Sequence, residues 1–261
     1  EEAERKNAPF RIMADHAPVL IWMSGTDKLC YYFNQVWLEF TGKTLEEETG
    51  NGWADGVHPD DFQHCLAVYV SSFDQRKKFS MEYRLQRKDG AYRWLLDNGS
   101  PIFDATGEFQ GYIGSCVDIT ELKLVERALK ESEQRLRSIV ENEPECVKIV
   151  SREGKVVDMN AAGLQMLEAD TLEQVTSTNV LNFIEESHRA AFQEMHERVM
   201  RGETASMEFE VVGMRGTHRR LETHAVPLFD ENHNVKYHLA VTRDVTDNRS
   251  LAEQLLQSQK L

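Results

Sequence analysis

The sequence lacks a long apolar run. Its longest uninterrupted apolar stretch covers residues 17–23, whereas a membrane-spanning helix needs about 20 apolar residues. We therefore expect no membrane-spanning segment within this chain. The sequence also lacks an excess of positive charge, because 44 acidic residues outnumber 30 basic ones and the formal net charge is −14. Binding to the phosphates of DNA or RNA requires a basic surface, so we expect no nucleic-acid partner.

Cysteine is scarce and its spacing is irregular. The four cysteines, Cys30, Cys65, Cys116 and Cys146, form no C-x-x-C pair. This spacing argues against a zinc cluster. A disulfide framework is typical of small secreted domains rather than of an acidic chain of this length. We therefore expect reduced thiols and a cytoplasmic location.

The two halves of the chain resemble each other. Adding 126 to a residue number in the first half repeatedly gives the same residue type, with an offset of 127 in part of each half. Matched pairs include Asn34 and Asn160, Gly90 and Gly216, Pro101 and Pro227, and Asp118 and Asp244. Two copies with so long a period indicate tandem domains rather than a solenoid of short repeats.

Each copy predicts the same order of elements. The first copy predicts strands at 19–23, 29–33, 79–87, 92–103 and 109–117, with a long helix at 59–73. The second predicts strands at 147–150, 156–159, 205–214, 218–229 and 235–241, with a long helix at 186–201. Asn34 and Asn160 are expected to cap short helices. The expected fold is α+β, with two domains that each hold a five-stranded antiparallel sheet with helices on one face.

At this level of detail each copy resembles the PAS domain. The first copy has Gly52-Trp53 and the turn Lys88-Asp89-Gly90, and the copies end in Asp118-Ile119-Thr120 and Asp244-Val245-Thr246. The resemblance covers residues 10–120 and 136–246. The implied organisation is the end of an upstream helix at 1–9, a first PAS domain at 10–120, a helical linker with a possible coiled coil at 121–135, a second PAS domain at 136–246 and the start of an output helix at 247–261.

The resemblance implies a sensory module. The last ten residues are similar to the helix that leads into the dimerisation and phosphoacceptor helix of bacterial sensor histidine kinases. This implies a fragment without catalytic residues, followed in the parent protein by a histidine kinase that autophosphorylates with ATP and passes the phosphoryl group to a response regulator. The alternatives are a PAS module that regulates a cyclic-dinucleotide enzyme or a chemoreceptor, or a haem or flavin redox or gas sensor.

Candidate cavity residues follow by analogy with the family. They are Trp22, Trp37, Phe40 and Cys65 in the first domain, and Met166, Phe183, Phe192 and Met195 in the second. Large apolar side chains at such spacing also occur in ordinary cores, so a plain core is the alternative. Either cavity could take a small molecule of unknown identity.

We expect no cofactor. Haem-binding relatives ligate iron through a histidine on the long helix, where this chain has Cys65 and Phe192. The Asn-Cys-Arg-Phe-like stretch of flavin photochemistry is absent, which leaves haem or a non-covalent flavin as the alternatives.

The ends of the two domains are the candidate signal-coupling sites. Asp118, Thr120, Asp244 and Thr246 lie where a strand is followed by a helix. We expect the two threonines to cap that helix and the four residues to carry strain from the sheet into the linker. The alternative is plain capping, which is worth about 1 kcal/mol at each site.

The linker carries a heptad seam. Apolar positions follow one another at intervals of three and four residues: Leu122, Val125, Leu129, Ser132, Leu136 and Ile139. This spacing predicts a homodimer through a parallel coiled coil, although one serine weakens the seam. The alternative is a single amphipathic helix that lies on its own domain.

Two further histidine motifs have ordinary explanations. His196-Glu197 is similar to the start of a phosphoacceptor box, but we expect His196 to be a surface residue on an amphipathic helix. His58, Asp60, Asp61 and His64 could hold a metal, but helix-start chemistry explains the two acids more simply, so we predict no metal site. No Gly-rich phosphate loop or nucleophile elbow is present, and we expect no catalytic residue.

Overall fold

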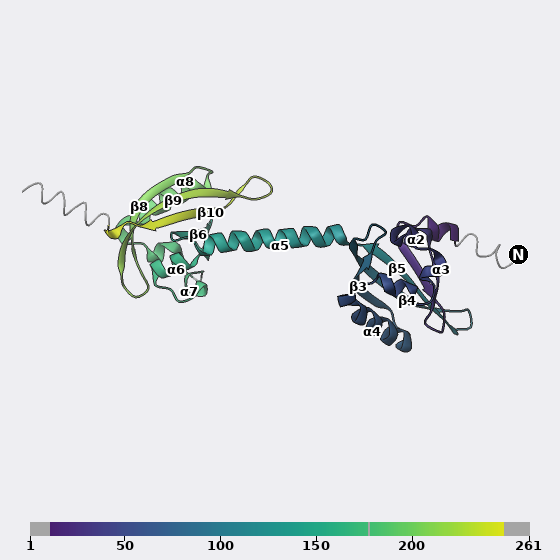
Figure 1. The fold of residues 1–261 in the computed structure, drawn as a ribbon. Coiled ribbons are helices and arrows are strands. Elements are labelled where there is room, and N and C mark those ends of the chain that lie inside the picture. Colours follow the sequence, from purple (N-terminus) through teal and green to yellow (C-terminus); the bar gives the residue numbers. More distant parts are fainter. Residues whose placement is uncertain (1–10, 177, 248–261) are drawn as a thin grey trace, which may run out of the picture. The chain divides into compact units, whose positions relative to one another are not determined.

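The computed structural model describes residues 11–176 and 178–247 (Figure 1). The predicted end of an upstream helix at 1–9, and the predicted output helix at 247–261 except for its first residue, therefore lie outside the described residues. The chain divides into two compact units, with the boundary after Lys130. Each unit contains one five-stranded antiparallel sheet, with strand order β2-β1-β5-β4-β3 in the first and β7-β6-β10-β9-β8 in the second. The predicted α+β fold with two such sheets is confirmed.

The first unit begins with a helical turn at residues 11–15. Its elements are β1 (Leu20–Ser24), β2 (Cys30–Phe33), α2 (Gln35–Thr41), α3 (Leu45–Glu48), η1 (Gly52–Gly56), α4 (Pro59–Gln75), β3 (Phe79–Gln86), β4 (Tyr92–Phe103) and β5 (Phe109–Asp118). Helix α5 (Thr120–Glu141) follows β5 after the single residue Ile119. The helices lie against one face of the sheet (Figure 1). Alternate residues of a strand such as β1 are buried and point toward that face.

The second unit repeats this order. Its elements are β6 (Cys146–Ser151), β7 (Val156–Met159), α6 (Ala161–Leu167), α7 (Leu172–Thr176), η2 (Val180–Phe183), α8 (Glu186–Met200), β8 (Ala205–Val212), β9 (His218–Phe229) and β10 (Val235–Asp244). Strand β10 extends three residues beyond the predicted end, because its pairing with β9 continues to Asp244 opposite Leu221. Strand β8 ends two residues earlier than predicted, just before the turn at Gly213.

The two cores differ in composition. The first is rich in aromatic side chains, with Trp22, Trp37 and Tyr69 at 5% exposure or less. The second is built mainly from aliphatic and methionine side chains around Phe192 and Phe209. The same backbone topology therefore encloses two chemically different interiors.

Asn34 is a buried hydrogen-bonding centre of the first unit. Its side-chain oxygen accepts from the backbone N–H groups of Ile21 (2.9 Å) and Trp37 (3.0 Å). Its side-chain amide donates to the carbonyls of Ala14 (2.7 Å) and Val19 (2.9 Å). The predicted N-cap of α2 is confirmed. In addition, this one side chain joins α2 to β1 and to the helical turn that precedes the sheet, which fills its donor and acceptor capacity.

Asn160 repeats this arrangement in the second unit. Its oxygen accepts from the N–H groups of Val147 (2.9 Å) and Gly163 (3.1 Å), which confirms the predicted N-cap of α6. Its amide donates to the carbonyls of Val140 and Glu145, both at 2.9 Å. Because Val140 belongs to the last turn of α5, a buried side chain of the second core binds the end of the linker helix directly.

Candidate functional site: two cavities and two junctions

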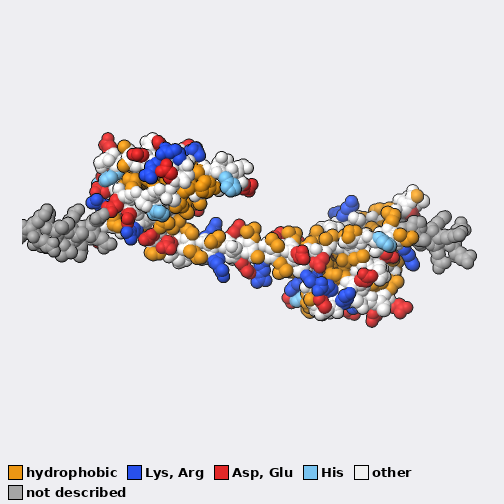
Figure 2. Space-filling view, turned by 90° about the horizontal axis from the view of Figure 1, so that it is seen from above, with side chains coloured by type: hydrophobic (Ala, Val, Ile, Leu, Met, Phe, Trp, Pro, Cys, Tyr) orange, Lys and Arg blue, Asp and Glu red, His pale blue; other side chains and the backbone are white. Residues whose placement is uncertain are grey.

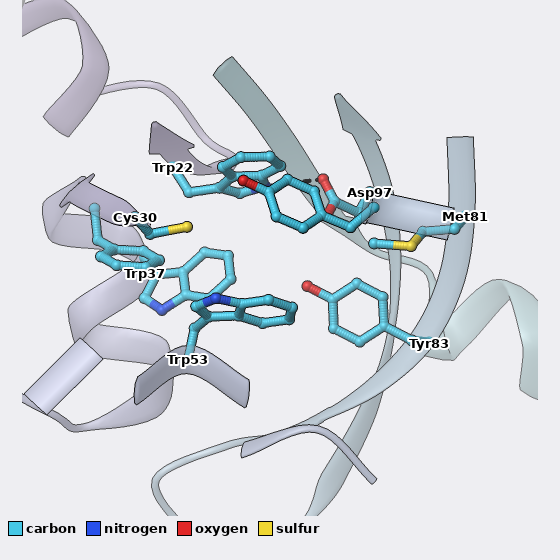
Figure 3. A pocket seen from close by; sticks show the side chains of 9 residues that line it. Trp22, Cys30, Trp37, Trp53, Met81, Tyr83 and Asp97 are labelled. Atoms are coloured by element: carbon cyan, nitrogen blue, oxygen red, sulfur yellow. Dashed lines mark hydrogen bonds between the residues drawn. The ribbon is translucent and has the colours of Figure 1, made fainter. Parts of the chain in front are cut away.

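The first unit has a small cavity between its sheet and helices (Figure 3). Its lining residues are Trp22, Cys30, Phe33, Trp37, Trp53, Tyr69, Met81, Tyr83 and Asp97. Two of the four candidate residues, Trp22 and Trp37, line it. Phe40 packs against the edge of the core instead, and Cys65 is buried at 1% exposure outside the lining.

Asp97 is the polar group of this cavity. It is 3% exposed, and its Oδ1 accepts a hydrogen bond of 3.0 Å from the indole N–H of Trp22. Burial raises the pKa of Asp97 to about 7, and the Trp22 hydrogen bond only partly opposes this effect. Asp97 is not among the cavity residues predicted from the sequence. The available signal was its position in β4, two residues after the buried Leu95 and therefore on the same inward face.

Aromatic side chains make most of the wall around this carboxyl group. Trp22 meets Tyr69 edge to face, with ring centroids 5.8 Å apart. The Tyr69 hydroxyl is already used, since it donates to Ser24 Oγ at 2.8 Å. The indole N–H of Trp53 is buried and has no hydrogen-bond partner among the described residues. Aromatic faces beside one carboxyl group suit a small polar or cationic molecule.

Cys65 is a poor candidate for an iron ligand in this setting. Burial raises the pKa of its thiol to about 12, so the neutral thiol prevails at neutral pH. Axial ligation by cysteine requires the thiolate.

The second unit has a small cavity between its sheet and helices. Its lining residues are Cys146, Lys148, Met159, Gly163, Met166, Leu167, Val180, Phe183, Ile184, Phe209, Val211 and Leu221. Met166 and Phe183 line it, as the analogy predicted. Phe192 lies instead between Phe209 and the outer surface, and Met195 is in the core outside the lining.

Lys148 is the charged group of the second cavity, and the sequence analysis missed it as well. It is 5% exposed, and its Nζ lies 2.6 Å from Thr242 Oγ1. Burial lowers the pKa of Lys148 because the charged form loses its hydration. The available signal was the repeat itself, since an offset of 126 places Lys148 at the inward position of Trp22.

The prediction that His196 is a surface residue is wrong. The side chain is 8% exposed, and its Nδ1 lies 2.9 Å from Nδ1 of His238 on β10. Its Nε2 lies 3.1 Å from the carbonyl of Arg152. Burial lowers the pKa of His238 to about 3, so this imidazole is neutral at pH 7, and its contact with His196 joins α8 to the sheet. The helix packs more of its surface against β10 than its sequence pattern indicated.

The acids at the start of α4 have a structural use. Asp61 binds the Arg84 side chain through two bonds of 2.8 Å and also accepts the Arg84 backbone N–H at 2.9 Å. His58 Nδ1 accepts from the N–H of Asp60. Within residues 11–176 and 178–247 no group of three or more His, Cys, Asp or Glu side chains is placed to hold a metal ion.

The first junction lies where β5 meets α5. Asp118 Oδ1 accepts from the N–H of Thr120 at 2.9 Å. The Thr120 hydroxyl does not cap the helix as predicted, because it accepts instead from the N–H of Trp94 on β4 at 2.9 Å. The N–H of Ile119 donates to the Trp94 carbonyl at 2.8 Å. The first residues of α5 are therefore bound to a strand of the sheet.

The second junction has the same geometry. Asp244 Oδ1 accepts from the N–H of Thr246, and Thr246 Oγ1 accepts from the N–H of Arg220, both at 2.9 Å. Arg219 adds an ion pair to Asp244 at 3.1 Å. The Thr246 hydroxyl thus also binds the sheet. Residues 248–261, to which this junction leads, are outside the described part.

Comparison with protein families gives the same match in both halves. Two family models, each described as PAS fold, match residues 31–116 and 140–250.

Three curated relatives are similar over parts or all of the chain. The uncharacterized protein y4lL of Sinorhizobium fredii is 42% identical over 49% of this chain and 15% of its own length. The two-component sensor PprA of Pseudomonas aeruginosa is 25% identical over 100% of this chain and 28% of its own length. The probable diguanylate cyclase DgcE of Escherichia coli is 29% identical over 44% of this chain and 10% of its own length. This chain thus spans less than a third of each of these relatives.

Within residues 11–176 and 178–247, no helix is both long enough and apolar enough to cross a membrane.

The raised pKa of Asp97 predicts a pH-dependent stability. The unfolded carboxyl group ionises near pH 3.8 and the folded one near pH 7, so the folded state binds the proton more tightly. The stability is therefore complete below pH 4 and falls as the pH rises through 7, by roughly 4 kcal/mol at most. We expect Asp97→Asn to remove this loss, measured as the free energy of unfolding in urea at pH 5 and pH 8.

Asp55→Asn, at an exposed position in η1, is the matched control and should retain the wild-type dependence. Parallel pH profiles for the wild type and Asp97→Asn would contradict the assignment.

Proposed function

Because this chain belongs to the PAS family and carries two PAS domains in tandem, we propose that its sensory module regulates a histidine kinase further along the same polypeptide. The observation that supports this most strongly is the bonding at the two ends of α5. Thr120 binds its first turn to β4 of the first domain, and Asn160 binds its last turn to the core of the second. The similarity of the whole chain to the two-component sensor PprA favours a kinase as the output.

A change in the first domain can reach the linker through few bonds. Trp94 lies on β4 three residues from Asp97, and its N–H and carbonyl both bind the junction that starts α5. A ligand that displaces β4 would shift the population of two linker geometries. The downstream kinase would respond to that shift and alter phosphoryl transfer to a response regulator.

The proposed unit is a homodimer through the linker helices. No side chain of α5 is buried. The seam residues Leu122, Leu129, Leu136 and Ile139 are between 55% and 61% exposed, and Figure 2 shows apolar side chains along the helix. A helix packed on its own domain would bury this seam, so the exposure favours the coiled coil over the alternative. A second copy of the same helix offers the matching heptad surface.

The second candidate output is a cyclic-dinucleotide enzyme. The similarity to the probable diguanylate cyclase DgcE supports it, although over less than half of the chain. The sequence of the parent protein after residue 261 separates the two. A His-Glu or His-Asp box in the following helix supports the kinase, and its absence supports the cyclase or a chemoreceptor.

The proposal needs neither haem nor flavin, and it places the module in the cytoplasm. The four cysteines are free and buried, as a reducing compartment allows. Purified protein with a flat visible spectrum would agree with this proposal, whereas a haem or flavin band would favour a redox or gas sensor.

Thr120→Val should alter signal output more than folding. It removes the hydroxyl that accepts from Trp94, and one such hydrogen bond is worth about 1 kcal/mol, or roughly a fivefold change in a two-state ratio. We expect a change of about this size in the autophosphorylation rate of the full-length parent, with a melting temperature within a few degrees of the wild type.

Thr106→Val is the matched control, because its hydroxyl lies in an exposed turn and binds only Asp104. Equal autophosphorylation rates in the wild type and both variants would reject the coupling role of the junction.

Leu129→Glu should weaken the dimer. It places a charge in the seam of both helices, whereas Leu124→Glu makes the same change at an equally exposed position outside the seam. We expect sedimentation equilibrium to show at least tenfold weaker association for Leu129→Glu and little change for Leu124→Glu. Equal effects of the two substitutions, or a monomeric wild-type chain, would contradict a heptad-paired linker.

A further inference from the structure

The two cavities carry different polar groups at the positions that the repeat aligns. The repeat aligns Trp22 with Lys148 and Asp97 with Thr223. Among the described residues the first unit buries the carboxyl groups of Asp97 and Glu48, whereas the second buries no carboxyl group and one amine. A buried amine at this place stabilises the folded domain less than an apolar side chain of similar size would, so packing of the core does not explain Lys148.

The hydrogen bonds of Lys148 leave most of its donor capacity unused. Among the described residues its Nζ has one hydrogen-bond partner, Thr242 Oγ1, at 2.6 Å. The Thr242 and Thr223 hydroxyls are 2.7 Å apart, and Thr223 reaches the Val241 carbonyl at 3.4 Å. These hydroxyls therefore satisfy one another. An ammonium group has three donors, and two of them remain available to a molecule in the cavity.

The rest of the cavity is apolar. Met159, Met166, Phe183, Ile184 and Leu221 are among its lining residues. The titratable groups nearest to the amine, Cys146 and His238, are both neutral at pH 7, because burial raises the pKa of the cysteine and lowers that of the histidine. Unbranched methionine side chains adapt to the shape of a flexible chain. This surrounding suits an alkyl group and supplies no anion of its own to Lys148.

We propose that the second PAS domain binds a straight-chain aliphatic carboxylate, with the alkyl chain in the cavity and the carboxylate paired with Lys148. A charge-assisted bond of this kind compensates the buried amine, and the alkyl chain gains by leaving water. The first cavity does not share this specificity. Trp22 stands there at the position of Lys148, and the carboxyl group of Asp97 would repel a carboxylate.

The site also lies next to the bonds that hold the linker helix. Lys148 pairs across the sheet with Met159, the residue before Asn160. Its preceding neighbour Val147 donates its N–H to the Asn160 side chain, which in turn binds Val140 of α5. Two hydrogen bonds, both made by Asn160, therefore connect the backbone neighbour of Lys148 to the end of the linker helix. The inference extends the proposed function, but the binding itself requires no output domain.

The first test compares ligands on the 261-residue chain. Carboxylates from butanoate to decanoate, the alcohols and the amines of the same lengths are titrated by calorimetry. We expect binding by at least one carboxylate, with the alcohol and amine of that length about 10- to 100-fold weaker, as expected for the loss of a bond to a charged group. Hydrogen exchange should slow in β6, β7 and β10 and remain unchanged in β1 to β5.

The second test compares two lysine substitutions. Lys148→Met keeps the volume and removes the amine, and Lys155→Met makes the same change at an exposed position of the same domain. We expect Lys148→Met to weaken carboxylate binding about 10- to 100-fold and to abolish the preference over the alcohol, while Lys155→Met binds as the wild type does.

Three results would overturn the proposal. They are no binding by any member of the series, equal affinity of the carboxylate and its alcohol for the wild-type chain, and unchanged carboxylate affinity in Lys148→Met. The comparison of carboxylate and alcohol on the wild type decides the question even if Lys148→Met does not fold. None of these results bears on the coupling of the junctions to the kinase, which the Thr120 variant tests separately.

Discussion

One buried asparagine in each domain holds the preceding helix, the first strand and the following helix together. Asn34 and Asn160 are at most 2% exposed, and each accepts two backbone N–H groups and donates to at least two carbonyls. A buried amide that lost these partners would leave backbone groups unsatisfied, at about 1–3 kcal/mol for each group. The position of the sheet relative to the incoming helix therefore depends on this side chain, and so does any use of the domain as a signalling unit.

The helix between the domains is bound differently at its two ends. At its start, two hydrogen bonds hold it to Trp94 of β4, one accepted by the Thr120 hydroxyl and one donated by the N–H of Ile119, and each is an individually weak contact. At its end, Asn160 holds Val140 from inside a packed core. A contact worth about 1 kcal/mol can be shifted by a modest ligand effect, whereas the buried one stays intact. This difference suits a helix that moves at its origin and transmits the change to the second domain.

The sequence predicted the architecture well because it contains two clear signals, the alternation of apolar residues in the strands and the repeat between the two halves. Alternating apolar residues gave the strands, and the repeat doubled the evidence for each of them, so β4, β7 and β9 have their predicted bounds. The interiors were less predictable. His196 was expected at the surface because the periodicity of a helix does not show which strand packs against it. Its partner His238, on β10, is 42 residues away in the sequence.

The same limit applies to the candidate site. Asp97 and Lys148 are charged residues in otherwise ordinary strands, and the folded structure shows that both line a cavity. The analogy that selected Trp22, Trp37, Met166 and Phe183 found residues of the lining by size. It also selected Phe40, Cys65, Phe192 and Met195, which pack elsewhere, because size alone does not distinguish a cavity wall from a core.

Hydrogen exchange of an Asn160→Ala chain tests most directly whether this side chain joins the linker to the second domain. The account predicts that exchange becomes faster together in the last turn of α5, at the start of β6 and at the start of α6, and stays unchanged in β1 to β5. Faster exchange confined to α6, with α5 protected as in the wild type, would show that Asn160 only caps its own helix and would contradict the account.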